Sequence, residues 1–369
     1  MDILADIGRW ISENESLLSG SAALIVVAGF VLSPLGAGIR RLFRSSPVQS
    51  QPERAVSDVA AGNGQDRLTL KELTAPSPDE VRFARSGATR IAFNQRGSGP
   101  VDLVVTPGII SNLNILGNLP ASRDFLRSLS GFARVLTFDK RGQGLSDPSL
   151  ATPALEDRTS DIEAVMDTAG IKRAILVGVS EGGPMCIHFA HSHPDRVLGL
   201  ILVGTTARFT QSEDFPIGIP QHHIEQIATL WGTGALRDIL FPSLSRELID
   251  DDTYKSMERL MGSRATLRQL VEMMAEIDVR ALLPDIRVPT LVVHFSGDLA
   301  IPIRLGRYLA ENIADAEFLE VNAVDHADLS QSPEAIERIR GFCEDNARKE
   351  FPRFMGNLFS NRPGDPGAN

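Results

Sequence analysis

Short runs of apolar residues recur between residues 81 and 321, and the stretches between them carry apolar residues at helical spacing. A run that is apolar at every position is typical of a strand buried on both faces of a parallel sheet. Strands that alternate with helices predict an α/β fold with a doubly wound, mostly parallel sheet. We expect eight strands, at residues 81–84, 90–94, 101–106, 135–138, 174–179, 197–203, 290–295 and 317–321.

The alternation stops between residues 206 and 283, where the pattern is helical and four of the eight methionines occur. This insertion follows the sixth expected strand, so we expect residues 207–283 to form a helical lid. Methionine adapts to irregular apolar shapes, and large apolar side chains of a lid are candidates to line a substrate pocket. The candidates are Phe215, Trp231, Met257 and Met261; the alternative is that they hold the lid together.

The N-terminal part contains a long stretch without charge, between Glu15 and Arg40. About 20 apolar residues suffice to span a bilayer, so we expect residues 1–44 to hold an interfacial segment and one transmembrane helix. Arg40, Arg41 and Arg44 follow the stretch, whereas acidic residues dominate before it. The positive-inside rule then places the chain in the inner membrane with everything after Arg44 in the cytoplasm. A cleaved signal peptide is the alternative, but it would begin with basic residues.

Two further segments lie outside the expected α/β domain, which we place at residues 68–347. Residues 45–67 are rich in Ser, Pro, Gln, Ala and Gly and show no apolar periodicity, which is typical of a flexible linker. The tail at 348–369 carries apolar residues at helical spacing with basic residues around them. Such an amphipathic helix either rests on the inner leaflet or docks on the protein's own core.

Composition and charge limit the partners. The chain has 369 residues, a formal net charge of −10 and a pI near 5.3. An acidic chain offers no basic face, so we expect no nucleic-acid partner. Cys186 and Cys343 lie far apart, which indicates buried thiols in a reducing compartment. His188, His191 and His193 lack the further ligands of a metal site, and we expect neither a metal nor an organic cofactor.

The sequence GVSEGG at residues 178–183 follows an expected strand and precedes a helical segment. A strand, a sharp turn with serine at its tip and a helix form the nucleophile elbow of serine hydrolases. The turn strains the backbone of the serine, and side chains at the flanking positions would collide with the strand and the helix. Glycine at Gly178 and Gly182 fits this requirement, and Ser180 is the candidate nucleophile.

A serine needs a histidine to take its proton and a carboxylate to orient that histidine. In this type of fold the partners follow the serine in the order acid, then histidine. Asp298 stands just after the strand expected at 290–295, and His326 stands after the strand expected at 317–321. Asp325 and Asp328 are alternatives for the acid, but they lie too near His326 in sequence to reach under its ring.

An oxyanion hole needs two backbone N–H groups that point at the developing charge. We expect one from Glu181, after the nucleophile, and one from Ile109, because Gly108 allows a close approach of that loop. The Glu181 side chain is expected to form a salt bridge away from the site. The sequence FDKRGQGLSD at 138–147 is expected to form a tight loop beside the elbow, held by its charges.

These motifs together resemble a known family. The segments TPGIIS at 106–111, FDKRGQGLSD at 138–147 and GVSEGGPM at 178–185 match it in type and order, as do EIDVR at 276–280 and the Asp298 and His326 segments. From about residue 81 to 347 the chain is similar to the α/β-hydrolases, in particular to the branch often fused ahead of class III adenylate cyclases. The resemblance implies an esterase-like activity and a triad of Ser180, Asp298 and His326.

The chain departs from that pattern in two respects. Pro107 stands where the family at large usually has a histidine before the oxyanion glycine. Few residues follow the last expected helix, so we expect no cyclase domain here. The resulting hypothesis is a membrane-tethered carboxylic-ester or lactone hydrolase that acts on a small apolar substrate. The alternative is a ligand sensor of the same fold that turns over slowly or not at all and signals through a partner.

Overall fold

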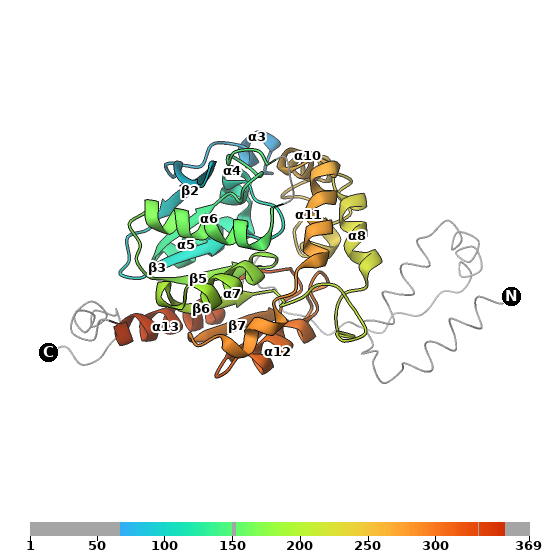
Figure 1. Ribbon diagram of the computed structural model, residues 1–369. Helices are drawn as coiled ribbons and strands as arrows, with labels where there is room; N and C mark the ends of the chain where they lie inside the picture. Colours follow the sequence, from blue (N-terminus) through green and yellow to red (C-terminus); the bar gives the residue numbers. More distant parts are fainter. Residues whose placement is uncertain (1–66, 150–152, 331, 351–369) are drawn as a thin grey trace, which may run out of the picture. The chain divides into compact units, whose positions relative to one another are not determined.

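The computed structural model describes residues 67–149, 153–330 and 332–350, which contain an eight-stranded sheet (Figure 1). Across the sheet the strands run in the order β1-β2-β4-β3-β5-β6-β7-β8. The β1–β2 and β2–β4 pairs are antiparallel, and the other pairs are parallel. The strands are β1 Arg82–Ser86, β2 Thr89–Arg96, β3 Asp102–Thr106, β4 Arg134–Phe138, β5 Ala174–Val179, β6 Val197–Val203, β7 Thr290–Phe295 and β8 Glu317–Val321.

The predicted sheet is confirmed, and each strand begins and ends within two residues of the expected bounds. Successive side chains of a strand point to opposite faces, so a sheet covered on both faces has two apolar cores. In β3, Val104 lies in one core, whereas Leu103 and Val105 lie in the other. This is why the central strands are apolar at every position.

Helices cover both faces of the sheet (Figure 1). One core is closed by α6 (Leu155–Thr168), α7 (Gly182–Ser192) and α12 (Ile303–Asn312). The other is closed by α5 (Pro120–Ser130) and α13 (Pro333–Glu350). Short 3-10 helices, η3 (Pro194–Arg196) and η4 (Arg280–Asp285), lead into β6 and β7.

The lid lies between β6 and β7 and contains α8 (Gln221–Leu230), α9 (Arg237–Leu240), α10 (Asp251–Met261) and α11 (Arg264–Glu276). Figure 1 shows α8, α10 and α11 grouped beside the sheet. α8 and α11 share an apolar core of their own. α10 packs on α3 (Leu70–Leu73) and α4 (Leu113–Asn118), so the start of the described domain supports the lid.

The expected transmembrane helix within residues 1–44 and the tail beyond residue 350 lie outside the described residues, as does most of the linker at 45–67. Within the described ranges, no helix has both the length and the apolar composition needed to cross a membrane. The last described helix, α13, continues past Ala347 to Glu350.

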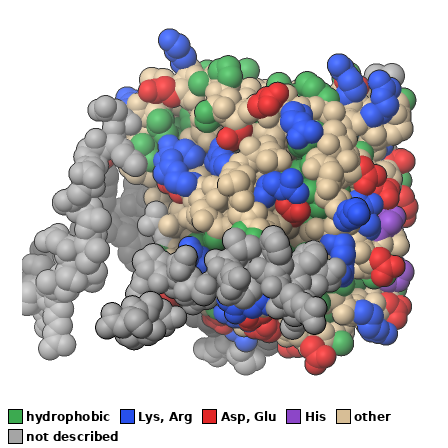
Figure 2. Space-filling model, turned by 90° about the vertical axis from the view of Figure 1, so that its left-hand side faces the viewer, with side chains coloured by type: hydrophobic (Ala, Val, Ile, Leu, Met, Phe, Trp, Pro, Cys, Tyr) green, Lys and Arg blue, Asp and Glu red, His purple; other side chains and the backbone are tan. Residues whose placement is uncertain are grey.

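Charged side chains of both signs are interspersed over the described residues on the face shown in Figure 2. Some of the charged surface side chains form ion pairs with one another. Arg280 lies 2.7 Å from Asp214 and 2.8 Å from Asp278, and Arg307 lies 2.7 Å from Glu320. Exposed pairs of this kind contribute about 0–1 kcal/mol each, so the cores described above dominate stability.

Candidate active site

The turn between β5 and α7 places Ser180 in a left-handed backbone conformation, with φ 52°. This conformation is strained for a residue with a Cβ and persists only where the surroundings impose it. A Cβ on Gly178 would lie 2.7 Å from the Gly183 Cα, and one on Gly182 would lie 2.3 Å from the Thr106 carbonyl oxygen. The glycines therefore bring β5, α7 and the end of β3 into backbone contact around the serine.

Two hydrogen bonds hold the tip of this turn against β6. The Ser180 N–H donates to the Val203 carbonyl at 2.9 Å, and the Thr205 hydroxyl donates to the Ser180 carbonyl at 2.5 Å. A Cβ on Gly183 would lie 2.1 Å from Thr205 Oγ1, so α7 packs directly on Thr205. This role of Thr205 was not predicted, because a threonine after a strand carries no specific signal.

His326 and Asp298 meet beyond the carboxyl ends of β8 and β7. His326 Nδ1 donates to Asp298 Oδ2 at 2.8 Å, and both side chains are buried. Burial alone would raise the pKa of the Asp298 carboxyl, but the charge and the hydrogen bond of His326 outweigh it and lower this pKa. An ionised Asp298 fixes the tautomer of His326 that keeps its proton on Nδ1.

The loop that carries Asp298 is itself held in place. Asp298 Oδ1 accepts the N–H groups of Ala300 and Ile301 at 2.9 and 3.0 Å. The ring of His294, inside β7, donates from Nε2 to the Ile301 carbonyl at 2.8 Å. The Asp298 Oδ1 atom thus binds its own loop, and the Oδ2 atom is the one that binds His326.

The alternative acids near His326 contact other groups. Asp325 accepts hydrogen bonds from the N–H of Ser243, at 2.8 Å, and from its hydroxyl. Asp328 accepts the N–H of Ser330 at 2.8 Å. Among the described residues, Asp298 is the carboxylate that contacts the His326 ring.

Ser180 lies at the same sheet edge as this pair, although within the described ranges its hydroxyl makes no hydrogen bond to His326. The His326 ring packs on Gly204, where a Cβ would lie 3.4 Å from the ring Cε1. Gly204 directly follows Val203, the residue to which the Ser180 N–H donates. Two adjacent residues at the end of β6 therefore contact the Ser180 backbone and the His326 ring.

The loop after β3 lies directly against Ser180. A Cβ on Gly108 would lie 3.2 Å from Ser180 Cβ and 3.6 Å from its Oγ. Over the described part of the chain, no carbonyl accepts a hydrogen bond from the N–H of Ile109 or Glu181. Glu181 is the N-cap of α7, where the helix dipole adds positive potential. Both N–H groups are therefore available to a bound oxygen.

The Glu181 side chain lies in a buried ion cluster. Lys140 Nζ and Arg158 Nη2 each lie 2.7 Å from Glu181 Oε2, and all three side chains are at most 3% exposed. Burial would raise the pKa of Glu181, but the charges of Arg158 and Lys140 outweigh it and lower this pKa. The expected salt bridge of Glu181 is confirmed, and it joins the elbow to the 138–147 loop.

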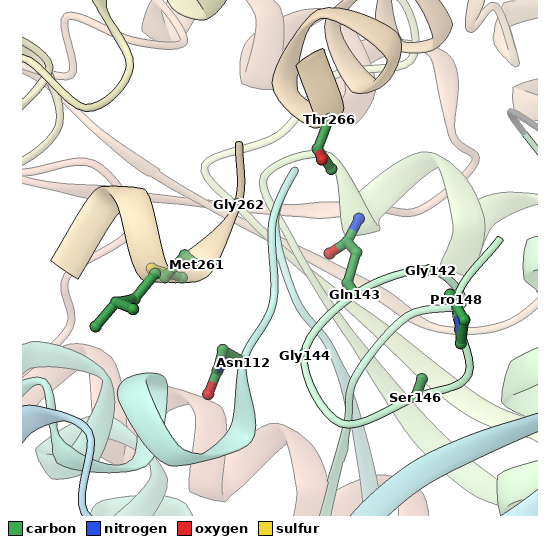
Figure 3. A pocket seen from close by; sticks show the side chains of 10 residues that line it. Asn112, Gly142, Gln143, Gly144, Ser146, Pro148, Met261, Gly262 and Thr266 are labelled. Atoms are coloured by element: carbon green, nitrogen blue, oxygen red, sulfur yellow. The ribbon is translucent and has the colours of Figure 1, made fainter. Parts of the chain in front are cut away.

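A pocket of about 340 Å³ opens between the 138–147 loop and the lid (Figure 3). Met261, Gly262 and Thr266 line it from the lid, opposite Gln143. Gly262 also lies close to the loop after β3, because a Cβ there would approach Ile110 Cδ1 to 2.8 Å.

Of the four lid candidates, Met261 lines this pocket. Phe215 and Trp231 are buried in the lid's own core, and Met257 packs between α10 and the α3–α4 region. The Trp231 indole donates to the Gly262 carbonyl at 2.8 Å, which helps to hold the α10–α11 turn. These three side chains are therefore packed in apolar clusters, Met257 against α3 and α4 and Phe215 in part against Tyr308 of α12.

Residues for a metal or for thiol chemistry do not come together in the described part of the chain. It contains no cluster of three or more His, Cys, Asp or Glu residues with the geometry to hold a metal ion. Cys186 and Cys343 are free and buried, and burial raises the pKa of both thiols, to about 12 for Cys186. Thiols of this kind are poor nucleophiles.

A strand-turn-helix elbow with serine at its tip, followed in the chain by a paired aspartate and histidine at one sheet edge, defines the protein as an α/β-hydrolase. A family model described as "Serine aminopeptidase, S33" matches residues 128–327, more than half of the chain, and the chain belongs to this family. The superfamily resemblance of the sequence is therefore confirmed.

Several proteins similar to this chain are hydrolases. The 2-hydroxy-6-oxononadienedioate/2-hydroxy-6-oxononatrienedioate hydrolase of Paraburkholderia phymatum is 27% identical over 266 residues, covering 68% of this chain and 89% of that protein. The pimeloyl-(acyl-carrier protein) methyl ester esterase of Chromobacterium violaceum is 32% identical over 185 residues, covering 48% and 72%. The crystal structure of the enol-lactonase from Burkholderia xenovorans matches with a TM-score of 0.59 at 25% identity, covering 71% and 99%.

Proposed function

We propose that the chain is a serine hydrolase that cleaves a carboxylic ester or a lactone through an acyl-enzyme. Ser180 is the nucleophile, His326 is the general base and Asp298 orients the His326 ring. The observation that carries the proposal is the 2.8 Å hydrogen bond from His326 Nδ1 to Asp298, formed at the sheet edge where Ser180 has a strained backbone.

In this mechanism His326 Nε2 takes the Ser180 proton as Oγ attacks the substrate carbonyl. The Ile109 and Glu181 N–H groups hold the oxyanion of the tetrahedral intermediate. When the intermediate collapses, His326 gives its proton to the leaving alcohol, and the acyl group stays on Ser180. Water, activated by the same histidine, then releases the acid and restores the free serine.

The choice of ester or lactone is supported by two of the similar proteins. Their names include a methyl ester esterase and an enol-lactonase, and both substrates present an acyl carbonyl with an oxygen leaving group. The site needs no metal for this reaction, because its base and its oxyanion donors belong to the chain itself. The pocket beside Met261, which has both polar and apolar lining residues, is the candidate place for part of the substrate.

Turnover on a panel of model substrates tests the proposal. The panel contains p-nitrophenyl esters of increasing acyl length, a set of lactones and an aminoacyl p-nitroanilide, since the family description names an aminopeptidase. We expect multiple turnover on the esters or lactones and far slower release from the anilide. Preferred cleavage of the anilide would show a peptidase and refute the ester assignment.

A ligand sensor is the second candidate, and the contact between the lid and the His326 loop favours it. The His326 N–H donates to the Leu240 carbonyl at 2.7 Å, and Asp325 binds Ser243. A ligand that moves the lid would then move the histidine loop as well. A burst of one acyl group per chain without further turnover is the expected result for a sensor, whereas sustained turnover identifies an enzyme.

A further inference from the structure

Two side chains of the 138–147 loop hold the backbone on either side of Ile109. The Lys140 ammonium donates to the Gly108 carbonyl, and the Gln143 amide donates to the Ile109 carbonyl at 3.1 Å. Gln143 is fixed in turn, because its Oε1 accepts the N–H and the hydroxyl of Ser111 at 2.7 and 3.0 Å. The peptide groups before and after Ile109 are therefore both anchored to one loop.

The Gly108 carbonyl and the Ile109 N–H belong to the same peptide group. The described chain contains no cis peptide bond, and in a planar trans peptide the N–H points away from the carbonyl oxygen. A donor that fixes the direction of the Gly108 carbonyl therefore fixes the direction of the Ile109 N–H. A positive charge at the carbonyl also polarises the peptide and makes its N–H a stronger donor.

The same ammonium binds the residue that carries the other N–H group. Lys140 Nζ donates to Glu181 Oε2 at 2.7 Å, and Glu181 directly follows Ser180. Lys140 is 1% exposed. Burial lowers its pKa to about 8 in spite of the opposing effect of Glu181, so the ammonium is mostly protonated at neutral pH.

Lys140 is not needed only to neutralise the charge of Glu181, as its charged neighbours show. The charged groups that face it are Glu181, Arg158 and Asp139. Arg158 already pairs with Glu181 at 2.7 Å. Only Lys140, and not Arg158, donates a hydrogen bond to the Gly108 carbonyl.

We propose that Lys140 is a positioning residue for the hydrolysis, which sets the Gly108–Ile109 peptide and the Glu181 backbone so that both N–H groups converge on the oxyanion. This inference rests on the proposed function, in which those two groups stabilise the intermediate. Lys140 acts through the backbone and does not touch the substrate. Its effect therefore belongs to the transition state and not to substrate binding.

The test compares full-length Lys140→Met with the wild type on a p-nitrophenyl ester. Complete removal of one oxyanion donor lowers kcat by about 10²–10³, and we expect a loss of roughly 30- to 300-fold with KM changed less than about 3-fold. Affinity for a boronic acid, which mimics the tetrahedral intermediate, should fall with kcat/KM. Arg158 still pairs with Glu181 in this variant, so we expect it to fold.

Arg141→Met is the matched control, because Arg141 is the neighbouring cation of the same loop. It pairs with Asp161 at 2.7 Å and with the Ser86 hydroxyl at 3.0 Å, and none of its hydrogen bonds goes to Gly108 or Glu181. We expect this variant to lose thermal stability and to keep a kcat near that of the wild type. An equal loss of kcat in both variants would mean that the loop acts only through folding, and the proposal would be overturned.

The pH profile of the wild type gives a second reading, with Lys140→Met as its control. We expect kcat of the wild type to fall as the pH rises through about 8, where Lys140 loses its proton, and this limb to be absent from Lys140→Met. A basic limb that persists unchanged in Lys140→Met overturns the proposal. So does a Lys140→Met protein with unchanged kcat. A wild type without any ester or lactone turnover overturns the proposed function as well.

Discussion

The Asp325 carboxylate accepts two hydrogen bonds from Ser243, one from its N–H at 2.8 Å and one from its hydroxyl. Ser243 belongs to the lid segment after α9, and Asp325 immediately precedes His326. The loop that carries His326 is therefore held by the lid on one side and by Asp298 on the other. Two buried carboxylates flank the same histidine, and their different partners predict different consequences of mutation.

Asp298→Asn should lower kcat by on the order of 10⁴, because an amide at this place favours the wrong tautomer of His326. Asp325→Asn should lower kcat less than about 10-fold and destabilise the fold by about 1–3 kcal/mol through weaker bonds to Ser243. Steady-state kinetics and urea unfolding of both variants check this. A larger kcat loss in Asp325→Asn would assign the orienting role to Asp325.

Replacing Ser180 should separate activity from stability. Ser180→Ala should lower kcat by about four to six orders of magnitude and abolish labelling by a fluorophosphonate probe. Ser180→Gly should be equally inactive but more stable than Ser180→Ala by about 1 kcal/mol, because glycine adopts the φ of 52° without strain. Thermal denaturation of the two variants measures the difference; labelling at another serine would disprove the assignment.

On the acid side of the pH–rate profile, the loss of activity should result from the uptake of a single proton. The pKa of Asp298 is lowered in the folded protein, so its contribution to stability is present above its ordinary pKa and is lost only as the pH falls through the lower, folded value. At mildly acid pH this contribution to stability is therefore retained, and kcat/KM should fall with unit slope as the single general base of the reaction takes up a proton. A slope of two would indicate that a second essential group titrates with it.

We further propose that residues 1–44 anchor the protein in the inner membrane with its hydrolase domain in the cytoplasm. The uncharged stretch before Arg40, Arg41 and Arg44 motivates this proposal, since clustered arginines resist translocation. Protease added to right-side-out spheroplasts should spare the domain, whereas lysed cells should lose it. Digestion in intact spheroplasts would reverse the topology, and recovery of the full-length protein in the soluble fraction would exclude the anchor.

The strands were predictable because burial on both faces leaves an uninterrupted apolar run, as at β5 and β6. The placement of Asp298 and His326 at one edge was also predictable, because parallel strands bring their carboxyl ends together. Both inferences use local pattern and topology alone. The salt bridge of Glu181 was predicted without its partners. Lys140 and Arg158 come from separate elements, and local pattern does not show which cations these elements bring to Glu181.

Contacts between distant segments were not predictable in this way. Nothing in the sequence around Ser243 or Leu240 indicates that they bind the loop of Asp325 and His326. The lid candidates illustrate a second limit. Met257 and Met261 lie on the same helix and have the same chemistry, but only the three-dimensional packing distinguishes the side chain in an apolar core from the one that lines a pocket.

The close contacts of Gly182 with the Thr106 carbonyl and of Gly183 with the Thr205 side chain have a consequence for the kinetics of folding. The end of β3 and the end of β6 are both required to impose the conformation of the elbow, and they pair with β5 from opposite sides. Contacts between distant parts of a chain form late, because loop closure must precede them. The strained conformation of Ser180 is therefore expected to form only after β3, β5 and β6 have assembled, and pulse labelling of Ser180 during refolding would report the time of that assembly.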